Sequence, residues 1–96
     1  MLDNHQKQHL KRLAHDRKPV VIIGANGLTD AVLAEIDGAL DRHELVKVRV
    51  NAGGREERTG IVDRIQQRLD AELVQQLGHV ATFFRRNPET PRIELS

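Results

Sequence analysis

The chain has 96 residues, 39% of them hydrophobic and 30% charged, and its formal net charge at pH 7 is +1. This length suffices for one small domain but not for two, and the absence of cysteine excludes disulfides, thiolate metal ligands and a cysteine nucleophile. No apolar run approaches the ~20 residues of a membrane helix and the polar N-terminus has no signal segment, so we expect a cytoplasmic protein without membrane contact.

The first predicted element is a helix over residues 4–15, because apolar side chains recur at helical spacing on one face. These residues are Leu10, Leu13 and Ala14. Lys7 and Lys11 are four residues apart and form a stripe beside this face, and Arg12 lies farther round the outside. Lysine stripes are commonly solvated surfaces, but this one leads through Lys18 directly into a strand and a glycine loop.

Charge is distributed unevenly along the chain. Residues 1–20 contain five Lys and Arg and two acids, whereas residues 28–44 contain one Arg and five acids. A basic segment followed by an acidic one is typical of a protein that meets a polyanion on one side only.

Two histidines of the first helix have a spacing that metal sites use, since His5 and His9 are four residues apart. However, Gln6 stands where the zinc-protease helix motif has its glutamate, and the sequence offers no evident third ligand. We therefore predict no metal site.

Residues 20–29 have the pattern of a strand, a glycine loop and the first turn of a helix. Four consecutive β-branched residues favour a strand covered on both faces, which we expect to be central in its sheet. Gly24 and Gly27 can adopt positive φ and let another molecule approach the backbone closely. Thr29, or alternatively Asn26, can cap the following helix. Unpaired N–H groups at such a junction suit a phosphate, although most junctions of this kind are only turns.

The middle of the chain predicts a helix over residues 30–42 and a strand over residues 45–50. The helix has an acidic outer face, which we interpret as a solvated surface that nucleic acid would avoid. The residues of this face are Glu35, Asp37 and Asp41. In the strand, valines alternate with Lys47 and Arg49, which predicts one dry face and one basic face.

The last third predicts a helix over residues 56–70, a hairpin with strands at 72–77 and 80–85, and a short edge strand at 92–95. Phe83 and Phe84 are the only aromatic residues, and as neighbours in a strand they should face opposite ways. One belongs in the core, and the other either stacks on a base or, as we favour, packs under the first helix or the tail. Arg85 and Arg86 add a second basic spot at the end of the strand.

The predicted order of elements is helix, strand, helix, strand, helix, strand, strand. Right-handed crossovers through the second and third helices should give two parallel strand pairs, and the hairpin adds an antiparallel strand. We therefore predict an α/β fold of the two-layer α+β type with a mixed four-stranded sheet, in a single domain over residues 1–96.

Four segments resemble one known family. They are residues 8–15 (QHLKRLAH), 18–29 (KPVVIIGANGLT), 33–36 (LAEI) and 43–48 (HELVKV). The chain is similar here to the CRM domain (chloroplast RNA splicing and ribosome maturation), in particular to its stand-alone bacterial YhbY-like members. The resemblance implies a fold like the C-terminal domain of translation initiation factor 3, RNA binding, and association with precursors of the large ribosomal subunit.

The glycine loop of that family corresponds to Gly24, Ala25, Asn26 and Gly27, and is likened to the G-x-x-G loop with which KH domains clamp an RNA backbone. KH loops often carry a basic residue between the glycines, which this loop lacks. A phosphate contact would therefore depend on backbone N–H groups and on neighbouring lysines.

We accordingly predict a small CRM-type RNA-binding protein acting in ribosome assembly, without catalysis, cofactor, metal or small-molecule substrate. Its expected partner is large-subunit ribosomal RNA or a precursor particle, bound by a monomer. The predicted RNA-binding residues are Gly24, Ala25, Asn26, Gly27, Lys7, Lys11, Arg12, Lys18, Lys47, Arg49, Arg85 and Arg86.

Two other classes remain open. A protein-interaction module could dock on a ribosomal protein or an assembly factor through the acidic helix at 30–42. A nucleotide- or anion-binding domain could use the loop as a phosphate cradle, but the loop lacks both G-x-G-x-x-G spacing and the Gly-Lys-Ser/Thr of a P-loop.

Overall fold

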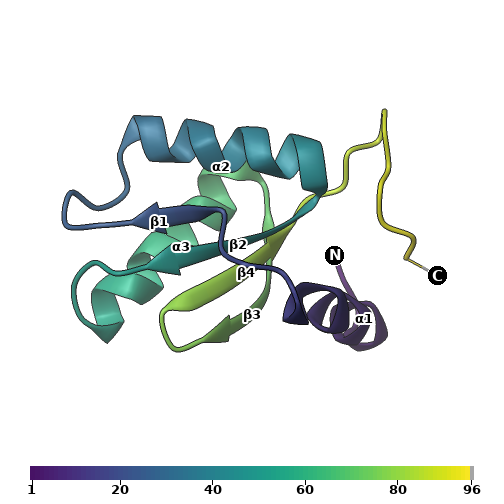
Figure 1. The fold of residues 1–96 in the computed structure, drawn as a ribbon, viewed down its shortest axis with the longest axis horizontal. Helices are drawn as coiled ribbons and strands as arrows, with labels where there is room; N and C mark the ends of the chain where they lie inside the picture. The colour runs from purple at the N-terminus through teal and green to yellow at the C-terminus, as the bar shows by residue number, and fades with distance from the viewer. Residues whose placement is uncertain (96) are drawn as a thin grey trace.

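The structure is a computed structural model and describes residues 1–95. Its elements follow the predicted order (Figure 1). They are α1 (Asn4–His15), β1 (Val21–Ile23), α2 (Asp30–His43), β2 (Leu45–Val50), α3 (Arg55–Leu69), β3 (Glu72–Leu77) and β4 (Val80–Phe84). Within residues 1–95, no helix combines the length and the apolar character needed to span a bilayer.

Helices α1 and α2 each begin directly after a side chain that caps the helix N-terminus. At α1, Asp3 Oδ1 accepts from the N–H of Gln6 at 2.8 Å and Gln6 Oε1 accepts from the N–H of Asp3 at 3.0 Å, a reciprocal pair that closes a capping box. At α2, Thr29 Oγ1 accepts from the N–H of Val32 at 3.2 Å, so Thr29 rather than Asn26 is the cap.

The sheet is mixed, as predicted, with the strand order β1-β2-β4-β3. Strands β1 and β2 are parallel, and β4 is antiparallel to both β2 and β3. The expected second parallel pair is therefore absent from the described sheet. The β3–β4 hairpin turns at Gly78, whose φ is +57°, and folds β4 back between β2 and β3, so these two strands are not neighbours.

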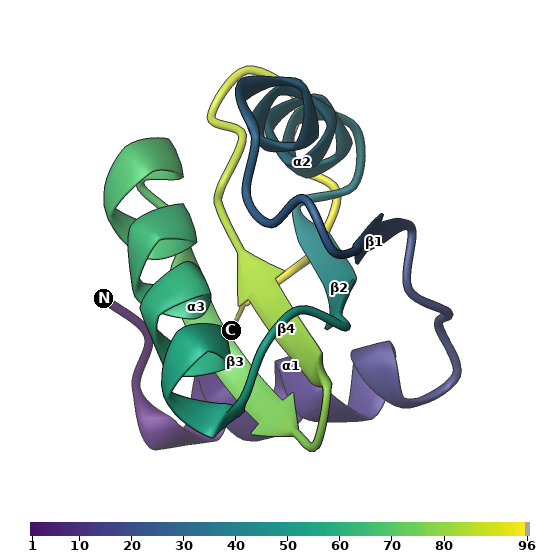
Figure 2. The ribbon, with the colours of Figure 1, turned by 90° about the vertical axis from the view of Figure 1, so that its left-hand side faces the viewer.

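The prediction that the first strand is central is wrong, because β1 is a three-residue edge strand. Val20 precedes it with 54% of its surface exposed, and Ile22 is 63% exposed. Only one face of β1 is covered, by α2, whereas α1 crosses the other face of the sheet at the far end (Figures 1 and 2). The apolar run at residues 20–23 therefore forms an edge strand with one exposed hydrophobic face, not a strand covered on both faces.

Two hydrophobic clusters lie on opposite faces of the sheet. The larger one packs α2 and α3 against one face and contains Phe83, which is fully buried. The smaller one packs α1 and the C-terminal segment against the other face, around Phe84. Both phenylalanines are thus buried, and the prediction that one packs beneath the first helix and the tail is confirmed. Neither ring is left to stack on a base.

The segment after β4 forms no strand at 92–95, contrary to expectation, and is instead fastened to Glu44. The Glu44 side chain is fully buried and its backbone has a φ of +62°. Its carboxylate accepts backbone N–H groups from Asn87 at 2.6 Å, Arg92 at 2.7 Å and Ile93 at 2.9 Å. Ile93 itself is buried in the smaller cluster. We call this attachment of residues 87–93 to Glu44 the tail latch.

Candidate nucleic-acid interface

The glycine loop leaves β1 as a tight turn open to solvent. The N–H of Gly27 donates to the carbonyl of Gly24 at 3.0 Å, and Gly27 has a φ of +71°. Within residues 1–95, the N–H groups of Gly24, Ala25 and Asn26 donate to no protein acceptor, and all three residues are exposed. Because Gly27 closes the turn, three open amides remain rather than four.

Space around the loop is also open. A Cβ atom built on Gly24 or on Gly27 would meet no other atom within 4 Å. A ligand could therefore approach the backbone closely on this side. The base of the loop is fixed, because Ile23 is fully buried and its carbonyl accepts the N–H of Asn51 at 2.8 Å. The turn is thus a rigid platform that offers its amides outward.

On one flank, the loop faces the start of α3 across a hollow of about 270 Å³. Glu57 and Arg64 of α3 both line this hollow with Asn26 and Gly27. The flank therefore carries both signs of charge. Arg64 was not among the predicted site residues, because only the tertiary packing of α3 brings it beside the loop and no local pattern marks it.

The basic stripe of α1 is divided between two sides of the helix. Lys11 and Arg12 line a groove of about 500 Å³ that α1 forms with the sheet, and Lys47 of β2 lines the same groove. Lys7 points elsewhere, since its Nζ lies 3.8 Å from Glu72 Oε2. Lys11, Arg12 and Lys47 have no carboxylate partner among the described ion pairs. The structure thus brings these three cations together and separates Lys7 from them.

Lys47 and Arg49 point to the same face of the sheet as α1. Leu45 precedes them in the same alternation and belongs to the cluster beneath α1. Arg49 pairs with Val80 on one side and with Ile22 of β1 on the other. Since β1 ends one residue later, in the glycine loop, the side chains of Lys47 and Arg49 lie between α1 and that loop.

The linker between α1 and β1 is held against β2. Lys47 Nζ donates to the carbonyl of Arg17 at 2.9 Å, and Arg17 Nη1 donates to the carbonyl of Leu45 at 2.9 Å. Lys18 follows, is exposed, and borders a separate hollow with Val20. The Arg17 contact was not predicted, and it fixes where Lys18 presents its charge.

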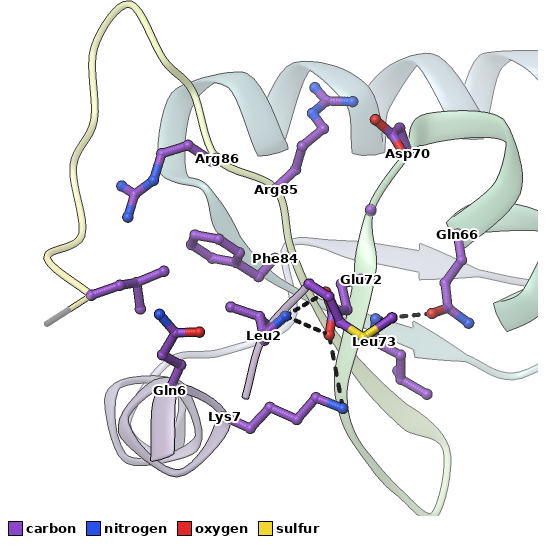
Figure 3. Close-up of a pocket in the computed structure, with 13 residues that line it drawn as sticks. Leu2, Gln6, Lys7, Gln66, Asp70, Glu72, Leu73, Phe84, Arg85 and Arg86 are labelled. Atoms are coloured by element: carbon purple, nitrogen blue, oxygen red, sulfur yellow. Dashed lines mark hydrogen bonds and ion pairs between the residues drawn. The ribbon is translucent and has the colours of Figure 1, made fainter. Parts of the chain in front are cut away.

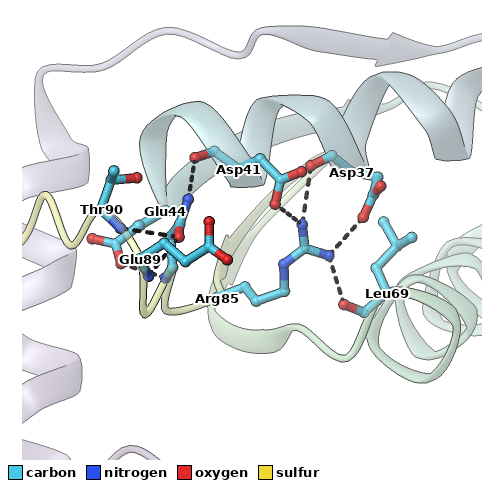
Figure 4. A network of polar contacts seen from close by, with 8 residues as sticks. Asp37, Asp41, Glu44, Leu69, Arg85, Glu89 and Thr90 are labelled. Atoms are coloured by element: carbon cyan, nitrogen blue, oxygen red, sulfur yellow. Dashed lines mark hydrogen bonds and ion pairs between the residues drawn. The ribbon is translucent and has the colours of Figure 1, made fainter.

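Arg85 lies away from this face and binds protein groups (Figure 4). Its guanidinium donates to Asp37 Oδ1 at 2.7 Å, to Asp41 Oδ1 at 2.9 Å and to the carbonyl of Leu69 at 2.9 Å. The acidic face of α2 is therefore partly neutralised from within the protein. Arg85 joins α2 to the end of α3.

Arg86 is engaged in the tail latch. Its Nη1 donates to Glu44 Oε2 at 3.2 Å and to the carbonyl of Ile93 at 2.7 Å. Its guanidinium carbon also lies 5.5 Å from the centre of the Phe84 ring, within the range of a cation–π contact. The structure does not bring Arg85 or Arg86 together with Lys11, Arg12 and Lys47.

A larger hollow of about 890 Å³ lies between the N-terminus, the end of α3 and β3 (Figure 3). Glu72 accepts the N–H of Leu2 with both carboxylate oxygens, at 3.0 and 3.1 Å, and approaches Lys7. Lys7, Arg85 and Arg86 line this hollow together with Asp70 and Glu72, so the lining is of mixed charge. Within residues 1–95, no three His, Cys, Asp or Glu side chains cluster in a way that could hold a metal ion.

Comparison with known proteins shows the family of this chain. The family model of the CRS1 / YhbY (CRM) domain matches residues 2–85. An RNA-binding protein of Haemophilus influenzae is 47% identical over 88 residues, which cover 92% of this chain and 89% of the relative. A probable RNA-binding protein of Bacillus subtilis is 30% identical over 95 residues, which cover 99% of this chain and 99% of the relative.

The fold has a solved counterpart. The solution structure of a hypothetical protein from Staphylococcus aureus matches with a TM-score of 0.84 and 31% identity, covering 100% of both chains. The predicted fold class and the family resemblance read from residues 8–48 are therefore confirmed. This chain belongs to the CRS1/YhbY (CRM) domain family.

Proposed function

We propose that this protein binds ribosomal RNA, in the context of large-subunit assembly, through the glycine loop and the basic face that α1 shares with β2. The proposal is supported by the open backbone amides of the glycine loop together with the grouping of Lys11, Arg12 and Lys47 in one groove. The relatives named as RNA-binding proteins support the choice of nucleic acid.

The chemistry of this surface suits a phosphate backbone. Three N–H groups at the loop can each donate to a phosphate oxygen, and they need no side chain to do so. The start of α2 already carries Asp30 in its first turn, which partly compensates the positive end of the helix dipole. The loop amides, and not the helix end, therefore provide the phosphate contact.

The cations give the interaction its strength and its salt dependence. Lys11, Arg12, Lys18, Lys47 and Arg49 lie on or beside this face. Neutralising phosphates with about five such charges predicts a slope of about −4 when the logarithm of the binding constant is plotted against that of salt concentration. Arg85 and Arg86, which are bound to carboxylates, are left out of this surface.

The test removes two of these charges together. We expect the double variant Lys11→Ala, Arg12→Ala to bind ribosomal RNA fragments more weakly and to lower the magnitude of the salt slope by about 1.5 to 2. A matched control is Arg42→Ala, Arg68→Ala, which removes the same net charge from exposed positions of α2 and α3. Fluorescence anisotropy titrations over a salt series measure both quantities. Equal losses in the two double variants would refute the proposed surface.

The alternative of a protein partner on the acidic face of α2 makes a different prediction. Binding of an assembly factor there would survive nuclease treatment, and Glu35→Lys on the exposed side of α2 would abolish it. RNA affinity would then be unaffected by Lys11→Ala, Arg12→Ala. A mononucleotide binder would instead show micromolar affinity for nucleotides by calorimetry.

A further inference from the structure

Part of the sheet face on the side of α1 is left uncovered by the helix. The helix crosses only the end of the sheet where Leu45 and Phe84 lie (Figure 1). Beyond it the sheet continues toward the hairpin turn, and the groove of about 500 Å³ runs along the boundary. We call this feature the α1 groove.

The floor of the α1 groove is apolar and open to water. Leu77 and Val80 pair across the β3–β4 hairpin and both line it, with Pro19 opposite. Leu77 has 66% of its surface exposed, and Ile22 on the same sheet face has 63%. Exposed aliphatic side chains gathered on one face of a small, charged protein commonly mark a surface that another molecule covers.

The rim of the groove is cationic. Lys11 and Arg12 stand on one side and Lys47 on another, and among residues 1–95 no Asp or Glu lines the groove. Gln75 contributes an amide, which can both donate and accept hydrogen bonds. An occupant that complements these groups has a negative charge, a flat apolar face and a polar edge. A nucleotide combines all three.

The nucleotide must be unpaired to enter. In a duplex the faces of the bases are stacked on each other and are not accessible, whereas bases in loops, bulges and single strands can be splayed out against a protein. The groove volume of about 500 Å³ lies at the low end of the range for small-molecule sites, about 300–1,000 Å³, and suits one or two bases rather than a helix.

We propose that the α1 groove holds an unpaired nucleotide of the bound RNA, with its base on Leu77 and Val80 and its phosphates at Lys11, Arg12 and Lys47. This inference rests on the proposed function and adds to it a requirement for a single-stranded segment. Because the contacts to the base are aliphatic, the groove favours unpaired RNA without selecting a particular sequence.

The first test compares two probes, a short oligouridine and a blunt-ended RNA duplex of the same length. We expect Leu77→Ser to weaken oligouridine binding about three- to tenfold, the size of effect expected from losing one apolar contact, and to leave duplex binding unchanged. Val20→Ser is the matched control, since Val20 is 54% exposed and lies outside the groove. Thermal melting of both variants checks that the fold is retained.

The second test locates the base directly. Oligouridine carrying a single thiouridine is crosslinked by light, and the modified peptide is identified by mass spectrometry. We expect the crosslink within residues 75–80, and its loss in Leu77→Ser. Crosslinks confined to residues 24–27 and to α1, with oligouridine affinity unchanged in Leu77→Ser, would overturn the groove proposal and leave the proposed function standing.

Two further results are decisive. If the wild-type protein binds neither probe nor ribosomal RNA fragments, the proposed function fails and the groove proposal fails with it. If an acidic synthetic peptide containing leucine displaces oligouridine and its binding is the one that Leu77→Ser weakens, the groove takes a protein and not a nucleotide.

Discussion

The tail latch predicts how the substitution Glu44→Gly changes the stability of the fold. This substitution has two opposite effects, which can be separated. Glu44 has a positive φ, a conformation that costs a residue with a side chain about 1 kcal/mol and glycine almost nothing. Glu44→Gly therefore relieves backbone strain while removing the carboxylate. If the carboxylate holds the tail, the variant must be less stable in spite of the relief.

The size of the loss follows from what the carboxylate holds. Three backbone N–H groups and one guanidinium lose their acceptor, and each such group costs about 1–3 kcal/mol if it stays buried. Detachment of the tail to water avoids that cost but exposes Ile93, which is 7% exposed in the fold, at about 2 kcal/mol. After subtracting the strain, we expect a net loss of at least about 1 kcal/mol, or roughly 4–8 °C in Tm.

Asp70 provides the matched control. It has a φ of +52° at the end of α3, is exposed, and its side chain makes no described hydrogen bond. Asp70→Gly should stabilise the fold by up to about 1 kcal/mol. Urea denaturation measures both variants, and hydrogen exchange at Asn87, Arg92 and Ile93 reports whether the tail is released. Stability of Glu44→Gly equal to or above that of the wild type would refute the latch.

The same latch predicts a dependence on pH. Burial raises the pKa of Glu44, but hydrogen bonds from Asn87, Arg92 and Ile93 and the charge of Arg86 outweigh it, so the pKa lies below its ordinary value. A carboxyl whose pKa is lowered by folding stabilises the fold above its unfolded pKa, and the contribution is lost as pH falls through the folded pKa. Stability of Glu44→Gln should therefore fall less steeply in acid than that of the wild type.

Three shorter predictions concern the cations and the loop. Lys11→Ala should weaken RNA binding more than Lys7→Ala, because Lys7 faces a carboxylate; equal effects in titrations would contradict this. Gly27→Val should abolish the loop contact and cost about 1–2 kcal/mol of stability, whereas Gly24→Ala should cost almost none, as urea denaturation can check. Arg85→Ala should destabilise the fold by about 1–3 kcal/mol without changing RNA affinity, and reduced affinity in the folded variant would return Arg85 to the interface.

Local sequence signals predicted the elements well. The helix and strand bounds depend on periodicity, caps and turn residues, all of which act over a few neighbouring positions, and Thr29 and Gly78 act where their chemistry predicts. The family resemblance rested on residues 8–48, where those local features are densest. The prediction that one of the two phenylalanines packs beneath the first helix or the tail also held, since alternation along a strand places Phe83 and Phe84 on opposite faces.

The predictions that failed concern contacts between residues that lie far apart in the sequence. Nothing within β1 indicates that the hairpin pairs with β2 and leaves β1 at the edge with Ile22 exposed. The partners of Glu44 lie 42 to 49 residues away, and no local pattern marks a buried glutamate at the start of a strand. Arg85 and Arg86 looked like surface charges for the same reason, because their carboxylate partners come from distant segments.

The smaller hydrophobic cluster joins the two ends of the chain, since Leu10 of α1 and Ile93 of the tail share it. During synthesis α1 leaves the ribosome early, yet its packing surface stays incomplete until Ile93 has been added. The helix that contributes Lys11 and Arg12 to the proposed interface thus completes its packing only after Ile93 has been added. A nascent chain therefore does not complete the proposed RNA-binding face until translation has passed the tail.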